Sequence, residues 1–178
     1  MSTWMEDTNI VYGDSTSQST AAYNTYYYGT AMSGNRSVTF NQIPALTKKI
    51  TVVFDQVSTN GTSPIIIQVG SYYSGIVTSG YSSMGSTNWT TLAQTTGLLT
   101  MQANNSVSWN SGVYTLAIVN GATMAYAWSG TMAQGQSYIG TGQGAISLGN
   151  PVYYLRITTL NGTDLIQNGY VNIIQHCA

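Results

Sequence analysis

The chain has 178 residues, of which four are Lys or Arg, five are Asp or Glu and one is His, with a formal net charge of −1. A typical soluble domain is about 25% charged, so a chain with 5% must be kept soluble by hydroxyl and amide groups. Such a composition disfavours an enzyme, predicts no metal or cofactor, and lacks both the basic patch that binds nucleic acid and the roughly 20 apolar residues that insert in a membrane.

The first 36 residues differ in composition from the rest. They carry tyrosines among Ser and Thr without a clear period. Two interpretations remain open, an arm that docks onto a neighbouring subunit or a first strand of the domain preceded by a loose terminus. For the docking interpretation the expected contact residues are Tyr23, Tyr26, Tyr27 and Tyr28.

The remainder, residues 37–178, is dominated by strand signals. In residues 49–57 apolar and polar side chains alternate, and residues 65–69 repeat the pattern; this is the period of a half-buried strand. Asn60-Gly61 lies between the two runs and supplies the backbone conformations of a tight hairpin turn. We therefore expect two successive strands joined by a hairpin.

Residues 72–94, rich in Gly, Ser and Thr, are expected to form a long connection with at most one short strand. Long ordered loops tend to carry function. The hairpin pattern then recurs twice, around Asn120-Gly121 and around Asn161-Gly162. The sequence therefore predicts an all-β fold, an antiparallel, jelly-roll-like β-sandwich in residues 37–178 with an N-terminal arm in residues 1–36.

The side chains offer little for catalysis. Asp55 and Asp164 are the carboxylates that could meet in a glycosidase-like pair, which needs a separation of about 5 to 10 Å. Asp164 is expected instead to stabilise its own turn and to pair with Arg156. His176, beside Cys177 near the end of the sequence, is not expected to activate a nucleophile.

Binding chemistry is better supplied. Tyrosine and tryptophan interleaved with amides and hydroxyls suit either a sugar or a neutral protein interface. Trp109 and Trp128 are expected in the core, whereas the aromatics of the loop-like region are expected to be exposed. The predicted ligand-binding residues, for a glycan or a partner, are Tyr72, Tyr73, Tyr81 and Trp89.

Several stretches resemble a module found at the C-terminal ends of bacteriophage and prophage tail fibres. They are Phe40-Asn41-Gln42-Ile43-Pro44, residues 48–63, Ile67-Gln68-Val69-Gly70, Trp128-Ser129-Gly130, residues 155–164 and Gly169-Tyr170-Val171-Asn172-Ile173. The resemblance covers residues 37–174 and implies a trimeric β-sandwich on the virion surface, made in the host cytoplasm. Tail fibres carry the module behind a long shaft, whereas about 36 residues precede it here, so docking onto a separate fibre or use elsewhere on the particle is expected.

Four functions follow as hypotheses. The first is a non-enzymatic, tail-fibre-tip-like virion protein, homotrimeric, that contacts other virion proteins and binds a host surface glycan. The second is a capsid decoration or cement protein bound to the major capsid protein. A polysaccharide depolymerase is disfavoured by the sparse carboxylates, and a lectin outside any virus is the fourth.

Overall fold

The structure, a computed structural model, describes side chains for residues 33–88, 90–101, 108–135 and 138–177, and strand backbone at 4–6, 9–11, 17–18 and 24–31. Within these residues the fold is all-β, and every strand pair is antiparallel. The described part of the chain has no helix long and apolar enough to cross a membrane.

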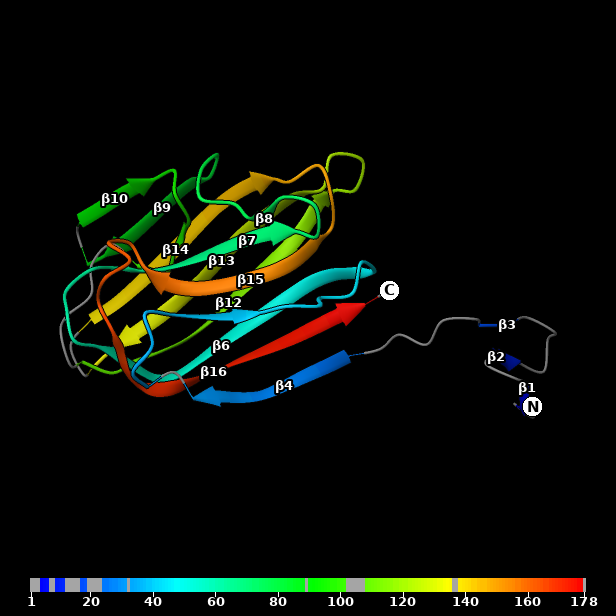
Figure 1. Cartoon of the computed structure of the whole chain (residues 1–178), viewed down its shortest axis with the longest axis horizontal. Helices are drawn as coiled ribbons and strands as arrows, with labels where there is room; N and C mark the ends of the chain where they lie inside the picture. Colours follow the sequence, from blue (N-terminus) through cyan, green and yellow to red (C-terminus); the bar gives the residue numbers. More distant parts are fainter. Residues whose placement is uncertain are drawn as a thin grey trace.

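Two sheets form the body of the molecule (Figure 1). The larger, eight-stranded sheet has the order β10 (Thr90–Gln94), β9 (Ser82–Thr87), β14 (Tyr138–Ser147), β13 (Ala125–Gln134), β12 (Asn110–Asn120), β6 (Thr47–Thr59), β16 (Ile166–Cys177) and β4 (Asn24–Ala31). The smaller sheet has the order β11 (Leu98–Leu99), β7 (Ile65–Ser71), β15 (Val152–Thr159) and β5 (Ser37–Phe40), with β8 (Gly75–Ile76) paired to β7. The strands β1 (Trp4–Glu6), β2 (Asn9–Val11) and β3 (Ser17–Gln18) pair with one another in a third, small sheet.

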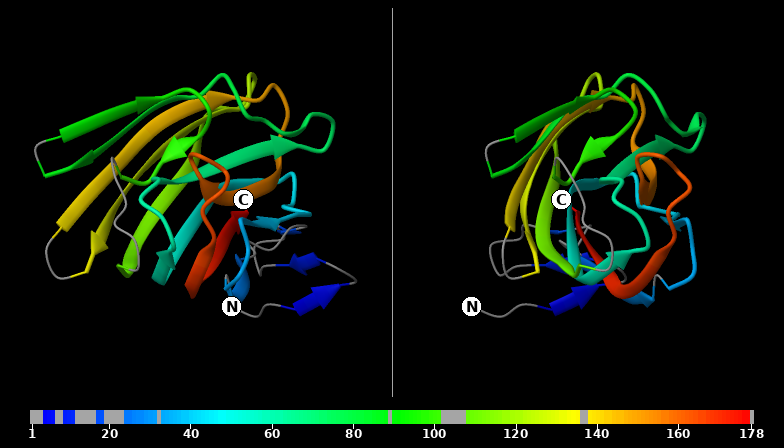
Figure 2. Two further views of the ribbon diagram at one scale, coloured as in Figure 1. Left: turned by 60° about the vertical axis from the view of Figure 1, so that its left-hand side comes forward. Right: turned by 90° about the vertical axis from the view of Figure 1, so that its left-hand side faces the viewer.

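In Figure 1, β7 and β15 cross in front of β12, β13 and β14, and the two views of Figure 2 show the same two layers from the side. The core lies between them. Inward-facing side chains such as Phe54, Tyr114 and Trp128 of the larger sheet and Ile67 and Leu155 of the smaller sheet are at most 2% exposed. The predicted antiparallel sandwich is thereby confirmed.

The aromatic centre of the core is a stack of Tyr114 on Trp128, with ring centroids 4.7 Å apart and planes 8° from parallel. Their polar atoms are satisfied by carbonyl groups of the last residue of β11 and of the residue that follows it. The Trp128 indole N–H donates to the Leu99 carbonyl at 3.2 Å, and the Tyr114 hydroxyl donates to the Thr100 carbonyl. Buried aromatics with a polar atom need such partners.

Only one of the three predicted hairpins is present. β12 and β13 pair across the turn at residues 121–124, whereas the connections at 60–64 and 160–165 each cross from one sheet to the other. Those two connections bind each other instead: the Asn60 N–H donates to the Leu165 carbonyl at 3.0 Å, and the Ser63 N–H donates to Asp164 at 3.1 Å. The hairpin prediction was wrong there because a turn sequence fixes local backbone angles and not the sheet that the next strand joins.

Two further expectations are corrected. Residues 72–94 are not mainly a loop, because they hold β8, β9 and β10, and β9 with β10 extends the larger sheet. Part of the N-terminal segment is a strand of the body, since β4 pairs with β16 at the edge of the larger sheet. Residues 24–31 therefore form a strand that is hydrogen-bonded to the body, as the first-strand interpretation expects.

Candidate functional site

The most distinctive local geometry of the sandwich is a bulge in β6. Asn168 of β16 pairs with Ser58 of β6, and Tyr170 pairs with Asp55, so β6 uses three residues where β16 uses two. The pairing of β6 with β12 on its other side also has one extra residue in β6. Gln56 takes up the extra length with a φ of 52°, and its N–H donates to the Ser111 hydroxyl at 3.0 Å. A non-glycine residue with positive φ is uncommon, and bulges are often found beside functional sites because they re-aim side chains.

Residues around the bulge hold it in place. Gly169 of β16 has a φ of 93°, and a Cβ there would lie 2.5 Å from the Cα of Val57, so only glycine fits. The buried Asn110 amide donates to the Val57 carbonyl at 2.8 Å, and the Gln134 amide donates to the Asn110 side-chain oxygen at 3.1 Å. The backbone carbonyl at the bulge is thus satisfied from inside the core.

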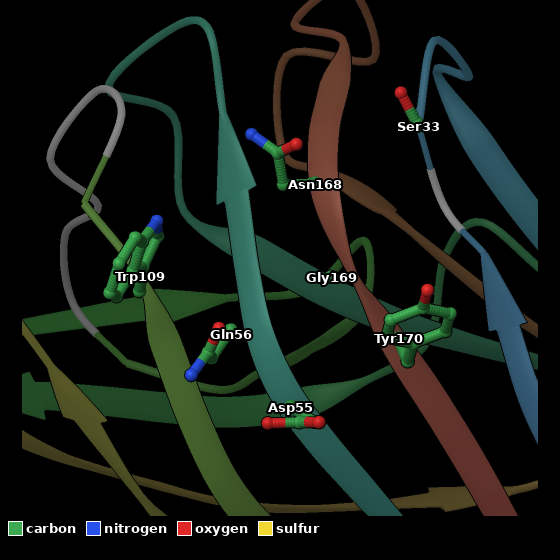
Figure 3. A pocket seen from close by; sticks show the side chains of 7 residues that line it. All are labelled: Ser33, Asp55, Gln56, Trp109, Asn168, Gly169 and Tyr170. Carbon is green, nitrogen blue, oxygen red and sulfur yellow. The ribbon is translucent and has the colours of Figure 1, made fainter.

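Above the bulge, the outward side chains form a hollow of about 420 Å³, which we call the Trp109 hollow. Its described lining residues are Ser33, Asp55, Gln56, Trp109, Asn168, Gly169 and Tyr170. Figure 3 shows Trp109 on one side, Tyr170 on the other, and Asp55 and Gln56 of β6 between them. Both rings are offered to solvent, with Trp109 59% and Tyr170 51% exposed.

The backbone under the Trp109 hollow is mostly that of strands β6 and β16. Trp109 directly precedes β12, and its carbonyl accepts the Gly135 N–H at 2.8 Å. Tyr170 lies between β6 and β4 in the sheet, paired with Asp55 and Ala31. Side chains placed by strands are held more exactly than side chains on loops, which favours a preformed binding site.

Its chemistry is that of neutral recognition with one anionic group. An aromatic face carries negative charge density and attracts the polarised C–H groups of a sugar ring. The Asp55 carboxylate only accepts hydrogen bonds, whereas the amides of Gln56 and Asn168 both donate and accept. Such a set can bind the hydroxyl groups of a polyhydroxylated ligand from several directions.

The second carboxylate considered for acid–base chemistry lies elsewhere. On β6, Asp55 is opposite Tyr170 and Thr59 is opposite Ile166, where β16 begins. Asp164 precedes Ile166, so it lies beyond the Thr59 end of β6, more than four strand residues or about 13 Å from Asp55. Asp164 is bound to the Ser63 N–H and accepts from the Asn161 amide at 2.7 Å. The described residues contain no group of three or more His, Cys, Asp or Glu able to hold a metal ion.

Two of the predicted binding residues lie together at a different place. Tyr72 and Tyr73 follow β7, are 67% and 82% exposed, and meet edge-to-face with centroids 5.5 Å apart. Tyr72 also contacts Tyr153 at 5.3 Å. These three tyrosines border a cleft of about 550 Å³, the tyrosine cleft, together with Gln42, Ile43, Pro44, Ala45, Asn150, Pro151 and Val152.

The other predicted residues do not join this cleft. Tyr81 is 3% exposed, contrary to expectation, because its hydroxyl accepts the Val69 N–H at 2.8 Å and donates to the Val77 carbonyl at 2.9 Å. Burial raises its pKa to about 12. Trp89 and Tyr23 lie outside the described residues, and Tyr26, Tyr27 and Tyr28 belong to β4 with side chains outside the description.

The Trp109 hollow was missed, although the sequence carries a signal for it. Inward apolar residues of β6 fall at Ile50, Val52 and Phe54, and the next one is Val57 rather than residue 56. That one-residue shift marks a bulge. Trp128 is in the core at 2% exposed, as expected, but Trp109 is not.

Comparison of the chain with protein-family models, with curated proteins and with solved structures finds no match in any of the three.

Proposed function

We propose that this chain is a non-catalytic, carbohydrate-binding β-sandwich displayed on a bacteriophage particle, and that the Trp109 hollow holds the glycan. The observation that carries the proposal is the pair of exposed rings, Trp109 and Tyr170, on either side of Asp55. Exposed large aromatics beside convergent polar groups are typical of ligand sites. Here the polar groups are one carboxylate and uncharged amides and hydroxyls, a set that favours a neutral sugar.

A binding role accounts for the hollow better than hydrolysis does. Glycoside hydrolysis needs two carboxyl groups on opposite sides of one bond. Asp55 is the one carboxylate among the described residues that line the hollow. We therefore assign Asp55 to hydrogen bonding with ligand hydroxyl groups and not to proton transfer.

The placement on a phage particle rests on the sequence resemblance of residues 37–174 to tail-fibre modules. A homotrimer that contacts other virion proteins is part of the same proposal. The alternative, a decoration protein on the capsid, differs in location, so electron microscopy of particles labelled through this chain separates the two. Label at the tail supports the first function, and label over the head supports the second.

The glycan site is tested by isothermal titration or a glycan array with the full chain and three variants. We expect Trp109→Ala and Tyr170→Ala to weaken glycan binding at least about tenfold, since central aromatic residues dominate binding energies. Tyr73→Ala, which removes an even more exposed aromatic in the tyrosine cleft, is the control and should bind as the unmodified chain does. Equal binding by the Trp109 variant, or loss of binding only in the Tyr73 variant, contradicts the assignment.

A further inference from the structure

Two of the four basic residues of the chain line one groove on the outward face of the smaller sheet. Arg156 lies on β15, opposite Thr39 of β5 and Gln68 of β7, and Arg36 lies just before β5. This arginine groove has a volume of about 280 Å³, and its described lining includes Arg36, Arg156, Thr96, Thr158 and Asn161. It belongs to the sheet opposite the one that carries the Trp109 hollow.

The Arg156 side chain is held in a fixed orientation by a neutral partner. The oxygen of the Gln68 amide accepts from Arg156 Nε at 2.9 Å and also from Nη2. Gln68 is 5% exposed, and its own amide nitrogen donates to the Thr96 carbonyl at 2.8 Å. These hydrogen bonds therefore fix the orientation of the Arg156 guanidinium. Because Gln68 is neutral, they do not offset its positive charge.

That contact leaves the binding end of the guanidinium available. A guanidinium has five N–H donors, and Gln68 accepts two of them. The remaining donors on Nη1 and Nη2 form the planar fork that matches the two oxygens of a carboxylate or phosphate. Arginine is the side chain best suited to such bidentate recognition.

No acidic side chain neutralises the groove within the described residues. Neither Arg36 nor Arg156 forms an ion pair there, and the expected pair between Arg156 and Asp164 is absent, because Asp164 is bound to Ser63 and Asn161. The groove's lining, as far as the structure describes it, contains no Asp or Glu. The two positive charges in the groove repel each other. A bound anion would offset that repulsion and so stabilise the groove.

The hydroxyl groups beside the arginines extend the recognition surface. The Thr158 hydroxyl donates to the Arg36 carbonyl at 2.9 Å and the Thr96 hydroxyl donates to Gln94 at 3.3 Å. Each of these oxygens can still accept a hydrogen bond from a ligand. A ligand with an oxyanion and neighbouring hydroxyl groups fits this arrangement.

We propose that the arginine groove is a binding site for an oxyanion, a carboxylate or a phosphate, carried by a polyhydroxylated ligand such as an acidic sugar. Arg156 supplies the bidentate fork, Arg36 the second positive charge, and Gln68 positions Arg156. The site is independent of the Trp109 hollow. Failure of glycan binding at one leaves the other untouched.

The test is titration of the full chain with glucuronate, inorganic phosphate and glucose in 0.1 M NaCl. We expect saturable binding of at least one anion. Glucose carries no charge, so any binding of glucose should be the same in the arginine variants as in the unmodified chain. Binding of glucuronate alone identifies a carboxylate site, and binding of phosphate identifies a phosphate site. In 1 M NaCl, where the Debye length falls from about 10 Å to about 3 Å, the anion affinity should drop.

Three variants locate the site. Arg156→Gln should weaken anion binding about tenfold or more, and the exposed Arg36→Gln about fivefold, because hydrogen bonds to charged groups are the stronger ones. Lys48→Gln removes one positive charge from an exposed position on the other sheet and should leave the affinity unchanged. If Arg156→Gln does not fold, Arg36→Gln against Lys48→Gln still decides. No saturable anion binding, or equal effects of Arg36→Gln and Lys48→Gln, overturns the proposal.

Discussion

The hydroxyl of Tyr81 fills a gap in the smaller sheet, and its removal should be measurable. Two short strands flank the same edge of β7: β11 pairs with Ile66 and Ile67, and β8 pairs with Gly70 and Ser71. The Val69 N–H lies between them and donates to Tyr81 at 2.8 Å. A phenol hydroxyl therefore takes the place of a strand at this position.

Tyr81→Phe leaves the Val69 N–H without this partner in the interior. A buried donor left unsatisfied costs about 1–3 kcal/mol, and the ring itself is retained, so no cavity adds to the loss. At pH 8 we therefore expect the free energy of unfolding to fall by about that amount. Tyr138→Phe, at a tyrosine that is 42% exposed, is the matched control and should change it little.

The size of this difference should depend on pH. Burial, partly offset by the Val69 backbone contact and by Arg156, raises the pKa of Tyr81 to about 12, against about 10 in an unfolded chain. The fold thus favours the neutral phenol. Its contribution is complete below pH 10 and is lost as the pH rises through about 12, and by pH 11 the loss is about 1 kcal/mol.

Phenylalanine cannot ionise, so the Tyr81→Phe variant escapes that loss. The gap in unfolding free energy between the variant and the unmodified chain should narrow by about 1 kcal/mol between pH 8 and pH 11. Urea denaturation followed by tryptophan fluorescence at both pH values measures it. A gap that stays constant, or one that widens, refutes the role assigned to the Tyr81 hydroxyl.

The remaining predictions concern packing and assembly. Gly142→Ala would place a Cβ 1.9 Å from the Leu99 carbonyl oxygen, so melting experiments should show a loss of about 1–3 kcal/mol or more, whereas Gly121→Ala, with open space around it, should be neutral. Removal of residues 1–23 should leave the sandwich folded but prevent attachment to the proposed phage particle. Removal of residues 1–31 also deletes β4, exposes the edge of β16 and should cause aggregation. Particle pull-down and size-exclusion chromatography distinguish these outcomes. The proposed homotrimer should form at both low and high salt in light scattering, since a chain that is 5% charged offers little for salt to screen.

Strand periodicity was sufficient to predict the architecture but not the connectivity. Alternation in residues 49–57 and in the two runs beside Asn120-Gly121 is a property of the local sequence, and it placed β6, β12 and β13 correctly. The choice between a hairpin and a crossing between sheets depends on contacts far apart in the chain. Asn60 with Leu165 and Asn161 with Ser63 are such contacts, and no local turn propensity encodes them.

The aromatic residues show the same division between local and tertiary information. Tyr81 was expected to be exposed because its neighbours are small and polar, yet those neighbours form β9, in which the alternate residues Ser83, Gly85 and Thr87 are buried. Trp109 was expected to be buried because tryptophan is apolar, yet it lies at the residue before β12 begins. Burial of an aromatic is decided by the sheet around it, which composition does not reveal.

Assembly of the sheets places several of the described charged side chains at specific sites. Asp164 joins the two connections that cross between the sheets, Asp55 stands between two exposed rings, and Arg36 and Arg156 share one groove. Solubility alone would require no such placement, because hydroxyl and amide groups already cover the surface. Since a charge without a nearby partner contributes little to folding stability, Asp55→Asn and Arg36→Gln should cost little stability, and their effects should appear in ligand binding.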